Sequence, residues 1–373
     1  MASPAMRQSL FPSVFLGLSL MAVYYMRLGP ASTAAGEHLA PVTEPGPFVF
    51  AESDGVALRE TYIGIPAIDT GLSVLVAAFL TGAAGWNQAF QLQQINFLFS
   101  FLPVIVVWSV EAGRSRNART AISFTSLWAL FYQTIGGAVI IPLWYVSYLY
   151  STSKPGYWDR SHEMPTPRAK ALLPALLVGY VLPTILMFQP FQSIWTQQFM
   201  VALWQPSPLF VNAIWWLLPI VFPSKGSASA KRVSSNDKGH LKPVYLTATV
   251  ISATVHIAVL ATCLRSENAE LSLWNVFVAT KWEKRPMSQA LHFIFQIDFW
   301  IIFAASILFC YVAIFDLTAT RMIDVGMIKP IGLLTLCTVL LGPGAALSAF
   351  WYWREGRLSN TSGGFVRTTK GYR

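Results

Sequence analysis

Charged residues are scarce in this sequence. Only 12% of its 373 residues are charged, whereas 54% are hydrophobic. Several apolar runs reach the length of about 20 residues that a helix needs to cross a lipid bilayer. Residues 97–110 and 301–315 are apolar on every face instead of alternating in polarity. The sequence therefore excludes a soluble globular domain and a membrane β-barrel, and it predicts an all-α, polytopic transmembrane helical bundle.

Motifs for metal or cofactor chemistry are missing as well. The three cysteines lie inside apolar segments, where neither a disulfide framework nor a metal cluster is expected. The five histidines are too scattered for the clustered boxes of di-iron enzymes. There is no DDxxD, NDxxD or DxDD motif, no Gly-rich phosphate loop and no nucleophile elbow. We therefore expect no metal and no cofactor, so that any chemistry depends on acids, bases and a shaped cavity.

Acidic residues are outnumbered by basic ones, 17 to 26, which gives a formal net charge of +9. The basic residues lie in short loops and in the C-terminal tail, and they do not form the stripe that is typical of a nucleic-acid-binding surface. We therefore expect the lipid bilayer as a partner and no nucleic acid, while protein partners stay undefined.

Nine apolar segments are candidate membrane spans, so the sequence predicts about eight or nine transmembrane helices. The segment at 121–150 is too long for one upright helix, and we expect tilt, a kink at Gly136-Gly137 or Pro142, or an extension along the interface. The segments lie near residues 10–25, 67–85, 93–110, 121–150, 170–188, 199–222, 243–263, 290–315 and 330–353.

Four regions follow from these segments. Residues 1–28 form a signal anchor or the first transmembrane helix, with a signal peptide as the alternative. Residues 29–66 are rich in Pro, Ala, Gly and acidic residues, so we expect an exposed loop. Residues 67–353 form the catalytic helical bundle, and residues 354–373 form a basic polar tail.

Ionisable side chains inside the apolar segments are the candidate site residues, because a charge in a membrane span is costly. Asp298 is the sharpest case, since it is surrounded by Phe, Ile and Trp, including Trp300, and has Gln296 nearby. No basic residue lies within a helical turn of it. Burial favours the neutral carboxyl, which makes Asp298 a candidate general acid. The alternative is a buried carboxyl bonded to a helix backbone.

Three further ionisable residues have a functional and a structural interpretation. Glu111 is a candidate site residue, or it forms a helix-end ion pair with Arg114 three residues later. Asp69 is a candidate site residue, or it caps the start of its helix. His256 has a direct role, or it donates to a carbonyl of a neighbouring helix.

Aromatic residues are abundant and make up 14% of the chain. Most of the tryptophans are expected to lie at the membrane interfaces. Aromatic faces attract cations, so a minority of these rings at mid-depth would stabilise a carbocation in a cavity without offering a nucleophile.

Several short phrases together resemble the integral-membrane terpene cyclases of fungal meroterpenoid pathways, of the macrophorin and ascochlorin type. The similarity runs from about residue 60 to 355. Ala138 departs from the family pattern, in which a third glycine is expected. The phrases are EAGRSRN at 111–117, QTIGG at 133–137, IPL at 141–143, GYVLP at 179–183, WQ at 204–205, FQID at 295–298 and GPGA at 342–345.

The resemblance implies cofactor-free cyclisation of a farnesyl chain attached to an aromatic or related ring. Protonation of a terminal alkene or an epoxide would start the reaction. The substrate would be a prenylated aromatic small molecule, and the enzyme would reside in the endoplasmic reticulum membrane. Asp298 or Glu111 is then the proton donor, and Asp69 or His256 accepts the final proton. The residues expected to tune the acid or to bind the substrate are Gln133, Arg114, Asn117, Trp204, Gln296 and Trp300.

Two other functions use the same residue types. A membrane isomerase of sterol-like substrates would shift a double bond instead of closing rings. A proton-coupled transporter would use the carboxylates and His256 as an ion path, but the sequence has no internal repeat and no polar stripe along one helix.

Overall fold

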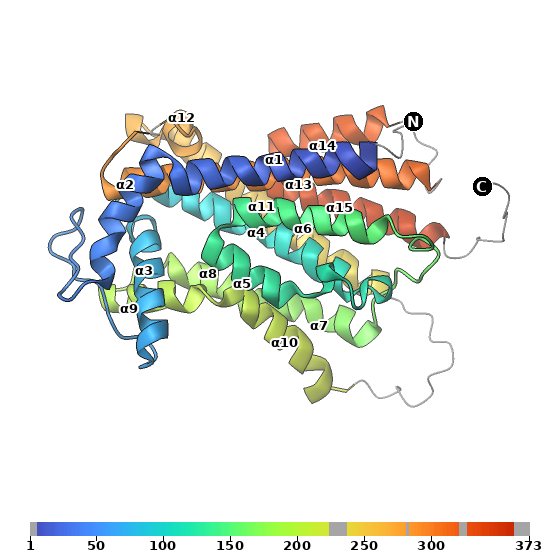
Figure 1. Cartoon of the computed structure of the whole chain (residues 1–373), viewed down its shortest axis with the longest axis horizontal. Coiled ribbons are helices and arrows are strands. Elements are labelled where there is room, and N and C mark those ends of the chain that lie inside the picture. The colour runs from blue at the N-terminus through green and yellow to red at the C-terminus, as the bar shows by residue number, and fades with distance from the viewer. Residues whose placement is uncertain (1–5, 224–236, 281–282, 321–326, 362–373) are drawn as a thin grey trace.

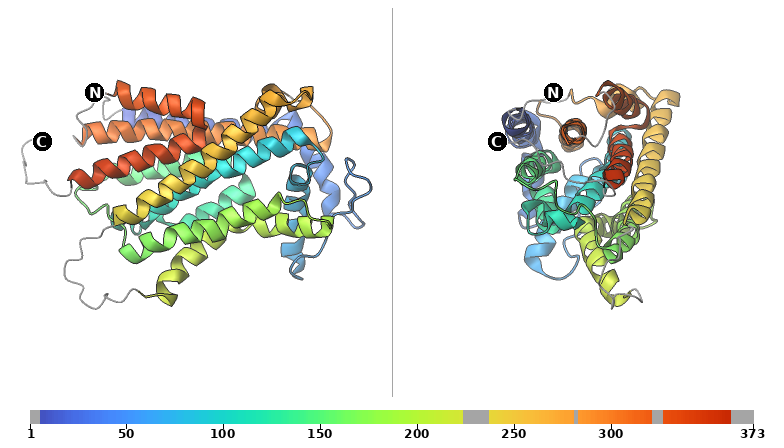
Figure 2. Two further views of the ribbon diagram at one scale, coloured as in Figure 1. Left: turned by 180° about the vertical axis from the view of Figure 1, so that it is seen from behind. Right: turned by 90° about the vertical axis from the view of Figure 1, so that its right-hand side faces the viewer.

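The computed structural model describes residues 6–223, 237–280, 283–320 and 327–361, and these ranges form helices and loops without a β-strand. Most helices run along the long axis, whereas α3 lies across one end (Figure 1, Figure 2). The all-α fold class is confirmed. The helices are α1 (Phe11–Val23), α2 (Pro30–Leu39), α3 (Pro66–Ala83), α4 (Gln88–Gly113), α5 (Thr125–Ile135), α6 (Gly137–Thr152), α7 (Thr166–Leu176), α8 (Leu182–Met187), α9 (Ile194–Trp204), α10 (Ser207–Val221), α11 (Asp237–Arg265), α12 (Leu273–Phe277), α13 (Met287–Ala319), α14 (Ile328–Leu341) and α15 (Pro343–Thr361).

Six helical stretches among the described residues are long and apolar enough to cross a membrane. Ser207–Val221 and Ile328–Leu341 are apolar but shorter, so the predicted count of eight or nine spans is not confirmed. Length and composition nevertheless indicate a membrane protein. The six stretches are Arg7–Leu28, Pro66–Ala83, Gln88–Gly113, Thr166–Met187, Asp237–Arg265 and Met287–Ala319.

Helix α4 is the centre of the bundle. It packs against α3, α11, α13 and α15, and nearly every residue of its second half is buried. A helix that is apolar on all sides needs such a position, because every face must be covered by another helix or by lipid. Helices α3, α5 and α13, which carry several of the site residues described below, therefore share α4 as a neighbour.

Two glycines interrupt the longest apolar segments. Gly136 has a φ of +119° and separates α5 from α6, which confirms the expected break in the 121–150 segment. Gly342 has a φ of +89° and divides the segment expected at 330–353 into α14 and α15, which pack against each other. Left-handed φ values favour glycine because it lacks a Cβ atom.

Two regions of the described chain, 29–66 and the C-terminal part of α15, differ from the sequence-based expectation. The stretch at 29–66, expected to be an exposed loop, contains α2, which buries Ala31, Ser32, Ala34 and Ala35 against the bundle. Small side chains allow this close approach although the composition is that of a loop. The expected polar tail begins inside α15, where Arg354 is buried, and residues 362–373 of that tail lie outside the described residues.

The N-terminal stretch Arg7–Leu28 packs along the bundle. Helix α1 contacts α6 and α13. The Arg7 guanidinium lies 2.6 Å from the Asp316 carboxylate, and the Ser19 hydroxyl donates to the carbonyl of Val139 at 2.8 Å. These contacts tie the stretch to two other helices between Arg7 and Ser19.

Replacing Gly344 with alanine is expected to destabilise the bundle by about 1–3 kcal/mol, the usual cost of overpacking. A Cβ atom at Gly344 would lie 2.5 Å from the carbonyl oxygen and 2.8 Å from Cα of Ser100, so α15 would have to move away from α4. Gly332→Ala is the matched control, because nothing lies within 4 Å of its Cβ position. Thermal unfolding of the detergent-solubilised proteins measures the difference, and equal midpoints would contradict this prediction.

Candidate active site

A cavity of about 520 Å³ lies among α2, α3, α4, α5, α9 and α13, and we call it the inner cavity. Its volume is within the range of about 300–1,000 Å³ that is typical of small-molecule sites. Its wall is mostly apolar, with the carboxyl group of Asp298 and the guanidinium of Arg27 as its charged groups. The six aromatic residues that line it are Phe79, Phe97, Phe101, Tyr132, Trp204 and Phe295.

These aromatic rings touch one another around the inner cavity. Phe295 is in edge-to-face contact with Phe79, with ring centroids 4.8 Å apart, and its ring centroid is 6.2 Å from that of Phe97. Phe101 and Tyr132 form a second edge-to-face pair at 5.2 Å. Rings packed in this way hold each other in place and present π-electron density to the cavity. Such a surface can stabilise a bound cation.

The side chain of Asp298, a residue of α13, is held in place by the first turn of α6. Its Oδ1 accepts a hydrogen bond of 2.5 Å from the backbone N–H of Ala138, one of the amides left free where α6 begins after Gly136. A Cβ atom on Gly137 would lie 2.6 Å from Cδ1 of Ile302, so glycine lets α6 and α13 approach here without moving that side chain. No hydrogen bond from the described residues reaches Oδ2 of Asp298, which is therefore available to a bound molecule.

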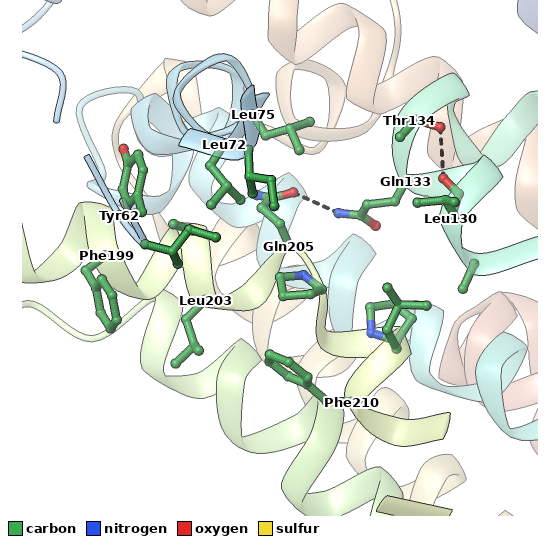
Figure 3. Close-up of a pocket in the computed structure, with 17 residues that line it drawn as sticks. Tyr62, Leu72, Leu75, Leu130, Gln133, Thr134, Phe199, Leu203, Gln205 and Phe210 are labelled. Atoms are coloured by element: carbon green, nitrogen blue, oxygen red, sulfur yellow. Dashed lines mark hydrogen bonds between the residues drawn. The ribbon is translucent and has the colours of Figure 1, made fainter. Parts of the chain in front are cut away.

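A second cavity of about 420 Å³ adjoins the inner cavity, and we call it the outer cavity (Figure 3). Leu75, Gln133 and Thr134 line both cavities. In the wall that the two cavities share, Nε2 of Gln133 donates a hydrogen bond of 2.7 Å to Oε1 of Gln205. The two glutamines thus form a polar contact in the wall of a space that is otherwise almost entirely apolar.

A family model described as the CtvD domain matches residues 12–358, which is most of the chain. The chain belongs to the CtvD domain family. The match spans the helices that form both cavities. No solved structure matches the chain.

Three curated relatives are similar to this member of the CtvD domain family. The terpene cyclase ascI of Acremonium egyptiacum is 28% identical over 214 residues, which are 56% of this chain and 55% of that protein. The terpene cyclase ctvD of Aspergillus terreus is 29% identical over 163 residues, 42% of this chain and 47% of that protein. The terpene cyclase rstn5 of Aspergillus nomiae is 28% identical over 332 residues, 84% and 89% of the two chains. The chain thus spans about half the length of the first two relatives and most of the third.

Asp298, Gln133 and Trp204 are the predicted site residues that the structure brings to the inner cavity. Trp204 lies on the wall with its Nε1 bonded to the hydroxyl of Thr184 at 2.9 Å. The predicted residues Gln296 and Trp300 lie elsewhere on α13. Their side chains donate to backbone carbonyls of Val276 and Phe277, so they hold α12 against α13.

Glu111, Arg114 and Asn117 lie together, but in a separate ion cluster and not on the inner cavity of this CtvD domain protein. Glu111 is ten positions after Phe101, the lining residue of α4 nearest to it in sequence, which is about 15 Å at 1.5 Å per residue. Its Oε1 accepts from Arg114 at 3.0 Å and from Arg354 at 2.8 Å. The Asn117 side chain donates to the backbone carbonyl of Glu111 at 2.6 Å.

The second carboxylate of the ion cluster is Glu355, whose Oε2 lies 2.6 Å from Nη2 of Arg114. Burial opposes ionisation of Glu355, but the adjacent charge and hydrogen bond of Arg114 outweigh burial and lower the pKa of this carboxyl. Both side chains are almost completely buried. The arrangement is that of a paired, charged structural network.

Neither Asp69 nor His256 is among the residues that line the two cavities, although Asp69 is bonded to the backbone of Tyr62 and Ile63 in the wall of the outer cavity. The carboxylate of Asp69 accepts hydrogen bonds of 2.9–3.1 Å from three backbone amides, those of residues 62–64, which fixes the loop before α3. Nδ1 of His256 lies 2.9 Å from Oδ1 of Asn96 on α4. These contacts are structural, but they differ from the expected ones: Asp69 does not cap its helix, and His256 contacts a side-chain amide instead of a backbone carbonyl. The roles of both residues in proton transfer stay predictions.

The sequence contained a signal for some cavity residues that were not predicted. Phe97 and Phe101 are four residues apart, which places them on one face of α4, and Phe295 precedes Asp298 by three residues on α13. Phe79 and Arg27 had no such local signal, because only the packing of α3 and of the N-terminal stretch brings them to the cavity.

Proposed function

We propose that the chain is a membrane-bound terpene cyclase that closes rings in the farnesyl chain of a meroterpenoid intermediate, starting from a terminal alkene or epoxide. The observation that carries this proposal is the carboxyl group of Asp298 in a cavity lined by six aromatic residues. The names of the three relatives described above, each a terpene cyclase, support the same class of enzyme. A location in the endoplasmic reticulum is part of the proposal and rests on the resemblance alone.

In the proposed reaction, Asp298 transfers the proton on Oδ2 to the terminal alkene carbon or to the epoxide oxygen. The resulting tertiary carbocation is attacked by the next double bond, which forms a carbon–carbon bond and moves the positive charge along the chain. Loss of a proton from the last cation gives a cyclic isomer of the substrate. The aromatic faces stabilise each cation during these steps.

Two features of the site support Asp298 as the donor. The apolar wall favours the protonated acid before the reaction. After transfer, the N–H of Ala138 and the positive end of the α6 dipole stabilise the carboxylate that remains. Asp298 is the one carboxylate among the described residues that line the inner cavity, so it can also accept the final proton.

Incubation of protein-containing membranes with a farnesylated phenol and with its terminal epoxide, in the presence of EDTA, tests this proposal. We expect a cyclic product with the mass of its substrate and fewer double bonds by NMR. In D2O, the product of the alkene should carry one deuterium on carbon, because the first proton comes from an exchangeable acid. Membranes of the same host without the protein are the control.

Conversion of neither substrate by folded protein would contradict the cyclase proposal. A product with a shifted double bond and no new ring would instead identify an isomerase.

A further inference from the structure

The outer cavity differs from the inner cavity in the chemistry of its wall. It is lined mainly by aliphatic side chains and prolines from α3, α5, α9 and α10, and no carboxyl group is among its lining residues. At its rim, Ile63, Ile68 and Leu130 are each about half exposed. An exposed apolar rim of this kind is typical of a surface that contacts lipid or an apolar ligand, so it offers an apolar molecule a route into the cavity.

The two side-chain amides of the outer cavity, those of Gln133 and Gln205, meet at its junction with the inner cavity, whereas Tyr62 lies away from them in the wall (Figure 3). Gln205 is only 2% exposed, and its Nε2 donates to the carbonyl of Val201 at 3.3 Å. Gln133 uses its Nε2 to reach Gln205, and no hydrogen bond from the described residues reaches its Oε1. The junction therefore offers a free amide oxygen next to a large apolar space. Gln133 is only partly buried and lines both cavities, so its Oε1 can accept a hydrogen bond from a donor on a ligand.

A prenylated ring consists of two parts that need different surroundings. The prenyl end must reach Asp298 and the aromatic faces of the inner cavity, where the cations form. The ring takes no part in the first steps, and it needs an apolar space without an acid and a partner for its hydroxyl group. The outer cavity and Oε1 of Gln133 provide both.

We propose that the outer cavity is a separate subsite for the oxygen-bearing ring of the substrate, and that Oε1 of Gln133 accepts a hydrogen bond from a ring hydroxyl. The prenyl chain then passes the Gln133–Gln205 contact into the inner cavity. This inference rests on the proposed cyclase function. It makes Gln133, and Leu203 of α9 in the wall of the outer cavity, determinants of which ring is accepted.

The test compares two terminal epoxides, one of a farnesylated phenol and one of farnesyl acetate, which has no ring. Leu203→Trp fills the outer cavity from α9, and Leu336→Trp makes the same change on the exposed face of α14. We expect Leu203→Trp to lower kcat/KM for the phenol at least tenfold more than kcat/KM for the acetate. Leu336→Trp should leave the ratio of the two values unchanged.

A second comparison isolates the hydrogen bond of Gln133. The wild type should prefer the free phenol to its methyl ether, and Gln133→Leu should abolish that preference by slowing the phenol at least fivefold more than the ether. This comparison also decides the matter if the wild type accepts ring-bearing substrates alone.

The outcomes separate this inference from the cyclase proposal. If the wild type cyclises these epoxides but neither variant changes its ratio, the subsite assignment is wrong and the cyclase function stands. If the wild type cyclises no epoxide, the cyclase proposal fails and the subsite assignment fails with it.

Discussion

Replacing Asp298 with asparagine is expected to slow ring formation at least about a hundredfold, within the range that a positioned general acid contributes. The amide cannot transfer a proton to an alkene or an epoxide. Its oxygen can still accept the hydrogen bond from Ala138, so the start of α6 stays capped and the fold is preserved. The measurement is the initial rate of cyclic product per folded protein, with the farnesylated phenol and its epoxide as substrates.

Asp316→Asn is the matched control for this variant. Asp316 is on the same helix, eighteen residues or about 27 Å further along, and it pairs with Arg7 instead of lining the inner cavity. Replacing Asp316 should leave the rate per folded protein within about twofold of the wild type.

Asp298→Asn should slow cyclisation of the alkene more strongly than cyclisation of the epoxide, because an epoxide oxygen is the more basic group.

Full activity of Asp298→Asn would overturn the assignment of the proton donor. If Glu111→Gln then lost activity in fully folded protein, Glu111 would be the acid despite its distance from the inner cavity.

The membrane helices were readable from sequence because a span of apolar residues has a fixed length, whatever its neighbours are. A kink at Gly136-Gly137 was one of the alternatives for the 121–150 segment, and the break occurs there because glycine accepts the positive φ of residue 136. Helix α2 was missed because its buried residues are alanine and serine, which are as common in loops. The number of spans depends on α10 and α14, whose apolar runs are too short for length alone to decide.

The candidate site was only partly accessible from sequence. Asp298 was found because a lone carboxyl in an aromatic segment is unusual, whatever the fold. The pairing of Glu111 with Arg114 was visible at a spacing of three residues, but Arg354 and Glu355 are more than 240 positions away and complete the cluster through packing of α15 on α4. From the sequence, Glu111 was therefore predicted as a site residue, whereas in the structure it forms ion pairs with Arg114 and Arg354 that hold helices together.

Replacing Glu111 with glutamine is expected to destabilise the fold by about 3–5 kcal/mol, the usual cost of removing one partner from a buried ion pair. Glu111 is completely buried and bridges Arg114 and Arg354. Without its charge, these two arginines and the buried Arg116 face one carboxylate, Glu355. The excess positive charge has no access to water, so the folded state loses stability. Thermal or denaturant unfolding in detergent measures the change.

Glu37→Gln is the control for the loss of an ion pair as such. Glu37 lies 2.8 Å from Lys284, but more than half of each side chain is exposed, so this change should cost less than about 1 kcal/mol. A destabilisation of Glu111→Gln no larger than that of Glu37→Gln would contradict the structural role of the cluster.

A double-mutant cycle with Arg354→Gln shows whether charge imbalance causes the loss. Glu111→Gln leaves Arg354 buried beside a neutral amide, whereas the double variant removes both charges and keeps the Arg114–Glu355 pair at 2.6 Å. We therefore expect the double variant to be about 0.5–3 kcal/mol more stable than the sum of the two single destabilisations predicts.

Because Glu111 is remote from the inner cavity, the fraction of Glu111→Gln that is folded at low temperature should still form rings at the wild-type rate.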